Sequence, residues 1–108
     1  MIRACGQDEL EPGTSMTVDV AGETVALFRG ESGDFFATQD SCTHEQWSLG
    51  TDGEVEGDEV VCPLHMARFD LRTGKALCLP ATLAMKTYAV VVDDHGDVFI
   101  SAAVEDTV

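Results

Sequence analysis

Two short pairs of cysteine and histidine constrain this chain more than any other feature of its sequence. The first pair is Cys42-Thr43-His44, and the second lies in Cys62-Pro63-Leu64-His65, with 17 residues between His44 and Cys62. The chain has 3 histidines in all, so a chance match of two of them to nearby cysteines is rare. Thiolates and imidazoles are metal ligands, and the two pairs together predict a metal centre.

The type of ligand alone leaves the metal open. Two thiolates and two imidazoles suit a tetrahedral zinc ion. They also suit a [2Fe–2S] cluster in which histidine replaces cysteine on one of the two irons. A third interpretation has no metal, with the cysteines as core residues and the histidines incidental.

The rest of the pattern is typical of an all-β protein. Met16, Val18 and Val20 alternate with polar residues, as in a strand with one buried face. Ala21-Gly22 and Gly57-Asp58 are turn signals between strand patterns. The expected strands are residues 15–20, 25–28, 35–38, 55–56, 59–62, 88–92 and 98–100.

Two segments break this pattern and are expected to be functional loops. Residues 39–50 and 62–68 are rich in Cys, His and polar residues, and they contain all four candidate ligands. The helical pattern is limited to Asp8-Glu9-Leu10, which is at most a turn. We find no linker or repeat, so residues 1–108 are predicted to form a single domain.

The charge of the chain excludes several classes of function. There are 20 Asp and Glu against 6 Lys and Arg, for a formal net charge of −14. This charge argues against binding to nucleic acid or an anionic membrane surface, and it favours steering toward a basic patch on another protein. Because no signal peptide or long apolar run is evident, we expect a cytoplasmic protein with metal-binding rather than disulfide-bonded cysteines.

The residues around the two pairs resemble the Rieske family. Cys-x-His followed at a distance by Cys-x-x-His is its signature, and Phe69-Asp70 stands where that family has an aromatic residue and Asp. Within the family, the chain is similar to the ferredoxins of bacterial aromatic-ring-hydroxylating dioxygenases, of the biphenyl and cumene type. The matching segments are Phe36-Ala37-Thr38-Gln39-Asp40, Trp47-Ser48-Leu49, Leu64-His65-Met66 and Arg72-Thr73-Gly74-Lys75.

The resemblance implies a fold, a cofactor and a role for each ligand. The fold is the Rieske iron–sulfur fold, with small antiparallel sheets and a cluster-binding subdomain of two loops. One [2Fe–2S] cluster per chain is expected, with Cys42 and Cys62 on the inner iron and His44 and His65 on the outer iron near the surface. Pro80 resembles the proline of a third loop that covers the cluster.

The resemblance also implies a function. The chain is expected to be a monomeric one-electron carrier. It would take electrons from an NADH-dependent flavin reductase and pass them to a terminal Rieske non-haem iron oxygenase. The chain has neither a second motif of two histidines and a carboxylate nor a glycine-rich nucleotide loop. We therefore expect a component of a dioxygenase system, not an enzyme by itself.

Three alternative functions remain. The chain could serve another oxygenase or reductase as a Rieske ferredoxin, or it could be a zinc-stapled interaction module. It also resembles the small subunit of assimilatory nitrite reductase, which keeps this fold without a cluster. The sequence does not identify the aromatic substrate, which the ferredoxin never touches.

The resemblance also predicts a low redox potential. High-potential Rieske proteins have a disulfide between the ligand loops, at positions occupied here by Trp47 and Leu64. Their hydroxyl residues, which bond to the cluster sulfurs, correspond here to Ala67 and Phe69. Without these hydrogen bonds the potential is expected at about −150 mV, the bottom of the Rieske range.

The remaining cysteines and the tryptophan are interpreted structurally. Cys5 and Cys78 lie outside the motif and are expected to be buried or partly buried thiols. Trp47 is expected to pack under the first loop rather than to contact a partner.

Overall fold

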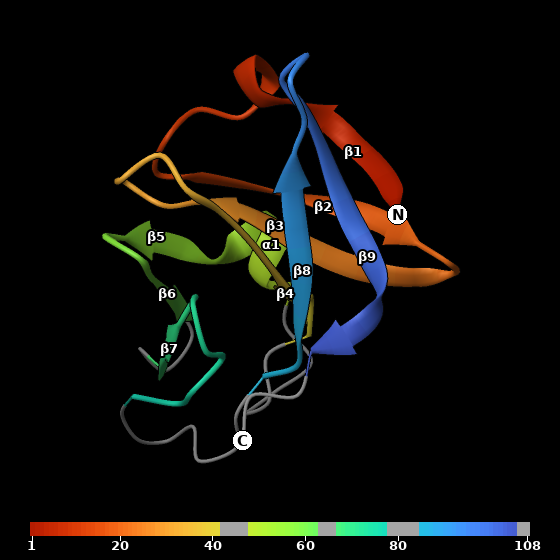
Figure 1. The fold of residues 1–108 in the computed structure, drawn as a ribbon. Coiled ribbons are helices and arrows are strands. Elements are labelled where there is room, and N and C mark those ends of the chain that lie inside the picture. Colours follow the sequence, from red (N-terminus) through yellow and green to blue (C-terminus); the bar gives the residue numbers. More distant parts are fainter. Residues whose placement is uncertain (42–47, 63–66, 78–84, 106–108) are drawn as a thin grey trace.

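The strands form two antiparallel sheets (Figure 1). The protein is described from a computed structural model, which covers residues 1–41, 48–62, 67–77 and 85–105, with the backbone alone for 102–105. The larger sheet has the strand order β1-β9-β8-β4-β3-β2, and the smaller has the order β5-β6-β7. The elements are β1 (Ile2–Gly6), η1 (Gln7–Glu9), β2 (Thr14–Val20), β3 (Glu23–Arg29), β4 (Phe35–Gln39), α1 (Leu49–Asp52), β5 (Glu54–Glu56), β6 (Glu59–Cys62), β7 (Ala67–Asp70), β8 (Thr87–Val92) and β9 (Asp97–Glu105).

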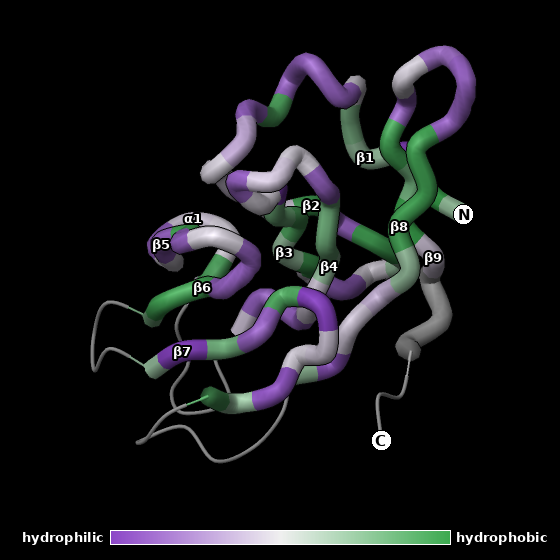
Figure 2. The backbone as a smooth tube through the Cα atoms, turned by 60° about the vertical axis from the view of Figure 1, so that its left-hand side comes forward, coloured by the Kyte–Doolittle hydropathy of each residue, from purple (hydrophilic) through white to green (hydrophobic). Residues whose placement is uncertain are grey.

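The predicted hairpins are confirmed at the predicted turns. Val20 pairs with Glu23 across a two-residue turn in which Ala21 and Gly22 have φ values of 52° and 86°. Two successive positive φ values suit a tight hairpin, because they match the right-handed twist of the flanking strands. A two-residue turn at Gly57-Asp58 likewise joins β5 to β6. In Figure 2 the strands β6 and β8 are hydrophobic, and the turn that joins β8 to β9 is hydrophilic.

Strand β3 is buried on both faces and separates two cores. Val25 and Leu27 pack into a core with strands of the larger sheet, and Ala26 and Phe28 pack toward the smaller sheet. Successive side chains of a strand point to opposite faces, so one strand can line both cores. The core between the two sheets, here called the junction core, contains Ala26, Phe28, Leu49, Val60, Cys62, Ala67, Phe69, Leu71 and Met85.

The predicted loops are shorter than expected because regular elements begin inside them. Helix α1 starts at Leu49, after Ser48 caps it by accepting a hydrogen bond from the Thr51 N–H at 3.2 Å. Strand β7 starts at Ala67, within the segment expected to be a loop. The predicted turn at Asp8-Glu9-Leu10 is the short helix η1. Strand β1 was not expected; it pairs with β9.

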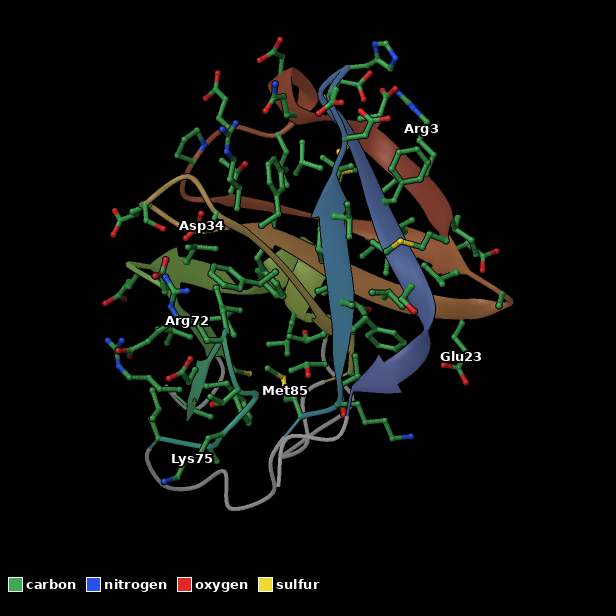
Figure 3. The ribbon with its side chains drawn as sticks, viewed as in Figure 1. Arg3, Glu23, Asp34, Arg72, Lys75 and Met85 are labelled. Carbon is green, nitrogen blue, oxygen red and sulfur yellow. The ribbon has the colours of Figure 1, made fainter. Side chains whose placement is uncertain are left out.

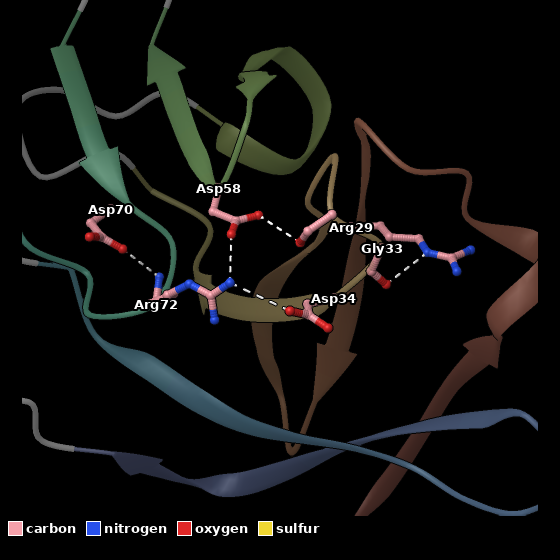
Figure 4. A network of polar contacts seen from close by, with 7 residues as sticks. Arg29, Gly33, Asp34, Asp58, Asp70 and Arg72 are labelled. Carbon is pink, nitrogen blue, oxygen red and sulfur yellow. Dashed lines mark hydrogen bonds and ion pairs between the residues drawn. The ribbon is translucent and has the colours of Figure 1, made fainter.

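A polar network joins the two sheets at the β5–β6 turn (Figure 4). The Arg72 guanidinium donates to the carboxylates of Asp58 at 2.6 Å and Asp34 at 3.4 Å. Asp58 also accepts from the Ser32 hydroxyl at 3.1 Å. A side chain at Gly30 would collide with Asp58, because a Cβ there would lie 2.2 Å from its Oδ1. The network therefore holds the smaller sheet against the β3–β4 turn.

Candidate metal centre

Cys62 is the predicted ligand that the structure describes. It ends β6 and its side chain is fully buried in the junction core. Burial opposes an uncompensated thiolate, and coordination to iron would compensate its charge. The other three predicted ligands, Cys42, His44 and His65, lie outside the described residues, as do Trp47, Leu64, Cys78 and Pro80.

The segment that carries Cys42 and His44 leaves and rejoins the described chain at adjacent residues. Ser41 and Ser48 form an isolated antiparallel bridge on either side of it. The Leu49 N–H donates to the Asp40 carbonyl at 2.8 Å, and the Asp40 carboxylate accepts from the Ser48 hydroxyl at 3.0 Å. The described residues on either side of residues 42–47 are thus held next to each other, and we call residues 42–47 the first ligand loop, following the sequence prediction.

The second ligand loop, residues 63–66, is closed by the β6–β7 pair. Cys62 lies opposite Ala67, and both side chains are fully buried. The ladder continues with Val61 opposite Arg68 and Val60 opposite Phe69. Cys62 is therefore the last paired residue of β6 before residues 63–66. The predicted ligand His65 follows it three residues later in the chain.

The described residues that flank a third segment, residues 78–84, form hydrogen bonds to the chain near the other two. On its first side, the Leu77 N–H donates to the Arg68 carbonyl of β7 at 2.8 Å. On its second side, the Met85 N–H donates to the Gly74 carbonyl at 2.7 Å, and Lys86 accepts at its carbonyl from the Gln39 N–H at 2.9 Å. Figure 3 shows Met85 and Lys75 at the same end of the molecule. The described ends of all three segments are thus tied to one another.

The donor set fits an iron–sulfur cluster. Two cysteines and two histidines supply the ligands that a Rieske centre requires, and Cys62 stands in an apolar environment. Within the described ranges, no group of three His, Cys, Asp or Glu residues could hold a different metal ion.

Cys5 is confirmed as a buried thiol that belongs to the fold. It is 2% exposed in the core of the larger sheet, away from the junction core. Burial raises the pKa of the Cys5 thiol, and the nearby Glu9 carboxylate raises it further. The neutral thiol is therefore favoured, as expected for a core residue.

The sequence interpretation missed the residues that close the first ligand loop. The segments that resemble the family include Gln39, Asp40 and Ser48, but the sequence indicates no role for these residues. Their polar character next to the motif was the available signal. Their partners, backbone groups of Gly50 and Lys86, depend on tertiary structure and could not be inferred from spacing.

Comparisons with known proteins agree with this geometry. The model of the Rieske [2Fe–2S] domain family matches residues 1–89. The biphenyl dioxygenase ferredoxin subunit of Pseudomonas sp. strain KKS102 is 43% identical over 84% of this chain and 83% of its own. The 3-phenylpropionate/cinnamic acid dioxygenase ferredoxin subunit of Photorhabdus laumondii is 46% identical over 94% of this chain and 93% of its own.

A solved structure shows the same fold with a partner. In a complex of reduced oxygenase and oxidised ferredoxin of carbazole 1,9a-dioxygenase, a matching chain superposes with a TM-score of 0.83 at 32% identity. The match covers 93% of this chain and 100% of that one.

The chain therefore belongs to the Rieske [2Fe–2S] domain family. Its cofactor is one [2Fe–2S] cluster. Within the family it is a ferredoxin of the kind found in aromatic dioxygenase systems, an electron carrier rather than an enzyme. No helix in the described part of the chain has the length and apolar character needed to cross a bilayer.

Proposed function

We propose that this ferredoxin carries single electrons from an NADH-dependent flavin reductase to the terminal oxygenase of an aromatic-ring dioxygenase system, as a cytoplasmic monomer. The relatives named as ferredoxin components of biphenyl and phenylpropionate dioxygenases support this function. The solved ferredoxin–oxygenase complex supports the oxygenase as a partner. The flavin reductase follows from the same resemblance, since a one-electron carrier needs a donor that divides the electron pair of NADH.

We further propose that Cys42, His44, Cys62 and His65 hold the cluster. The burial of Cys62 in the junction core is the single observation that supports this assignment, because Cys62 is also the last residue of β6 before the second ligand loop. Cys42 pairs with it on the inner iron, and His44 and His65 bind the outer iron. The bound cluster would supply one-electron redox chemistry at this site.

The protein residues would set how easily the site accepts an electron. Neutral imidazoles add no charge, so the site carries two thiolate charges rather than four, and an added electron meets less repulsion. Val60, Phe69 and Met85 in the junction core exclude water from the Cys62 side. Electrons would then enter and leave on the histidine side.

The domain proposed for the carrier is the whole of residues 1–108. The family model ends at residue 89, but β8 and β9 continue the larger sheet beyond it. Strand β9 pairs with both β8 and β1, so it joins the N-terminal strand to the rest of the sheet. Its Ile100 and Val98 are fully buried.

Metal analysis of the purified protein separates the cluster from the zinc alternative. Two irons and two sulfides per chain, with a brown colour and an electron paramagnetic resonance (EPR) signal on reduction, support the carrier. A colourless protein with one zinc per chain contradicts it. A cluster-free chain would agree with the nitrite reductase small-subunit alternative.

Reconstitution tests the partners separately. The ferredoxin is combined with a flavin reductase and each of several aromatic-ring oxygenases, and oxygenase reduction is followed at its own absorption bands. Reduction that depends on the ferredoxin supports the proposed pathway. Reduction of some other oxygenase class alone would favour a Rieske ferredoxin that serves another system.

A further inference from the structure

The Asp40 side chain closes the first ligand loop from one side. Asp40 directly follows β4, and its Oδ1 accepts from the Ser48 hydroxyl at 3.0 Å and the Gly50 N–H at 2.9 Å. Its backbone carbonyl accepts from the Leu49 N–H at 2.8 Å. One residue before the loop therefore binds three consecutive residues after it.

This closure leaves little room for movement. Gly50 packs so closely against its neighbours that a Cβ would lie 2.7 Å from Thr17 Cγ2 and 3.0 Å from Asp40 Oδ1. The Gly50 carbonyl accepts from the Ser15 hydroxyl of β2 at 2.9 Å. The Asp40 carboxylate thus binds the first residues of α1, which themselves pack on the larger sheet.

The Gln39 side chain ties the same loop to the third segment. Its Nε2 donates to the Ser41 carbonyl at 2.7 Å, and its Oε1 accepts from the Lys86 N–H at 2.9 Å. Ser41 directly precedes Cys42, and Lys86 is two residues beyond the third segment. The side-chain amide of Gln39 therefore fixes the distance between Ser41 and Lys86.

We infer that Gln39 and Asp40 are positioning residues of the cluster site. Asp40 fixes both ends of the loop that carries Cys42 and His44, and Gln39 fixes the start of that loop relative to the third segment. Both act through the ligands and not on the cluster itself. The inference rests on the proposed ligand assignment. It predicts that loosening these contacts alters ligand geometry at the iron before it unfolds the domain.

Asp40→Ala is the direct test, and Asp93→Ala is its matched control. Asp93 also accepts two backbone hydrogen bonds, from His95 and Asp97 at 2.9 Å each. It follows β8 at the end opposite Lys86. Loss of hydrogen bonds to a carboxylate predicts release of iron to a chelator about tenfold faster in Asp40→Ala. Its reduced-state EPR signal should also shift. Asp93→Ala should match the parent in both measurements.

Conservative variants separate the contacts. Asp40→Asn keeps an acceptor oxygen and should release iron within about threefold of the parent rate. Gln39→Glu keeps the acceptor for the Lys86 N–H but loses the donor to the Ser41 carbonyl, so its EPR signal should shift. If Asp40→Ala does not fold, Ser48→Ala removes one donor to the same carboxylate and should change both readouts in the same direction.

The inference is overturned if the Asp40→Ala and Asp93→Ala proteins show the same EPR signal and the same iron release. It is also overturned if Asp40→Asn is as impaired as Asp40→Ala, because the acceptor oxygen would then not matter. Failure of the proposed ligand assignment gives a different result, since Cys42→Ser would then keep the visible absorption bands of the parent protein.

Discussion

At the scale of single residues, the proposed ligand Cys62 belongs to the junction core. It is fully buried among the side chains of both sheets. In so small a domain, the free energy of binding the cluster contributes directly to folding. Loss of a cysteine ligand should therefore affect colour and stability together.

We expect Cys62→Ser and Cys42→Ser each to lose the cluster and most of the folded population, measured by visible absorption and thermal unfolding. Cys5→Ser is the matched control, because Cys5 is a thiol buried in the other core. It should lose some stability but keep the absorption bands. A Cys62→Ser protein with the parent's bands and melting temperature would show that the ligand assignment is wrong.

Ala67 offers a test of the redox potential. It lies opposite Cys62 in the β6–β7 ladder, so the two side chains are cross-strand neighbours, and the test requires that a hydroxyl at position 67 reach a sulfur. A hydrogen bond to sulfur stabilises the reduced, more negative cluster. Ala67→Ser should therefore raise the potential above that of the parent, which we expect at about −150 mV.

Phe69→Tyr should raise the potential as well, provided that its hydroxyl reaches a sulfur. Phe69 is fully buried, so a hydroxyl without a partner would lower stability instead. Voltammetry of parent and variants decides the matter. A parent midpoint well above zero would show that hydroxyl groups at these positions do not control the potential.

Asp93 provides a pH-dependent contribution to stability. The pKa of its carboxyl group lies below the ordinary 3.8, chiefly because it accepts the Asp97 N–H, and also because it accepts that of His95. Because the folded-state pKa is lowered, this stabilisation is present above the unfolded pKa and is lost as the pH falls through the folded value. Asp93→Asn should therefore flatten the acid side of the profile of melting temperature against pH. A profile parallel to that of the parent would contradict this assignment.

The sequence predicts four ligands but not the residues that would support them. The prediction of the ligands was possible because the motif consists of two short pairs with a set spacing. The roles of Asp40 and Gln39 could not be predicted, because their partners are backbone groups of residues up to 47 positions away. Such contacts produce no periodic pattern in a sequence.

At the scale of elements, the strands that lie between clear turn signals were predicted, whereas β1 and β7 were not. The hairpin of β2 and β3 follows from alternating apolar residues and a glycine turn. Strand β7 was missed because it includes the polar residues Arg68 and Asp70 and directly follows a ligand loop. Helix α1 has four residues, too few to show a helical period.

The ion pairs between the sheets should differ in their contribution to the free energy of unfolding. Asp58 accepts from both Arg72 and Ser32 and its side chain is 26% exposed, whereas Asp34 is 64% exposed and lies 3.4 Å from Arg72. We expect Asp58→Asn to lower the free energy of unfolding by about 1 kcal/mol and Asp34→Asn by close to nothing. Denaturant titration measures both. Equal losses would mean that the network does not depend on Asp58.

At the scale of the whole molecule, we expect the acidic charge to control encounter with partners. Each of the four arginines binds acceptor groups within the chain. Arg3 binds Asp97, and Arg29 binds backbone carbonyls. Arg68 binds Glu56 and Glu59, and Arg72 binds Asp58 and Asp34. A net charge of −14 remains, which attracts a basic docking site. We expect the docking face to include the predicted ligands His44 and His65.

Electron transfer to the oxygenase should therefore slow as salt rises, because ions screen this attraction. Stopped-flow reduction of the oxygenase at several ionic strengths measures the effect. The control is the rate at saturating ferredoxin, which should change less because encounter no longer limits it. A second-order rate that stays constant with salt would rule out electrostatic steering.

Pulsed EPR of the reduced protein distinguishes a [2Fe–2S] cluster with two histidine ligands from a cluster without them. The protein is labelled with ¹⁵N at histidine only, so that any nitrogen coupling to the cluster comes from an imidazole. We predict coupling to two histidine nitrogens, with one of them lost in His44→Cys and the other in His65→Cys. A cluster without nitrogen coupling, or a signal unchanged in both variants, would contradict the assignment of His44 and His65 as ligands.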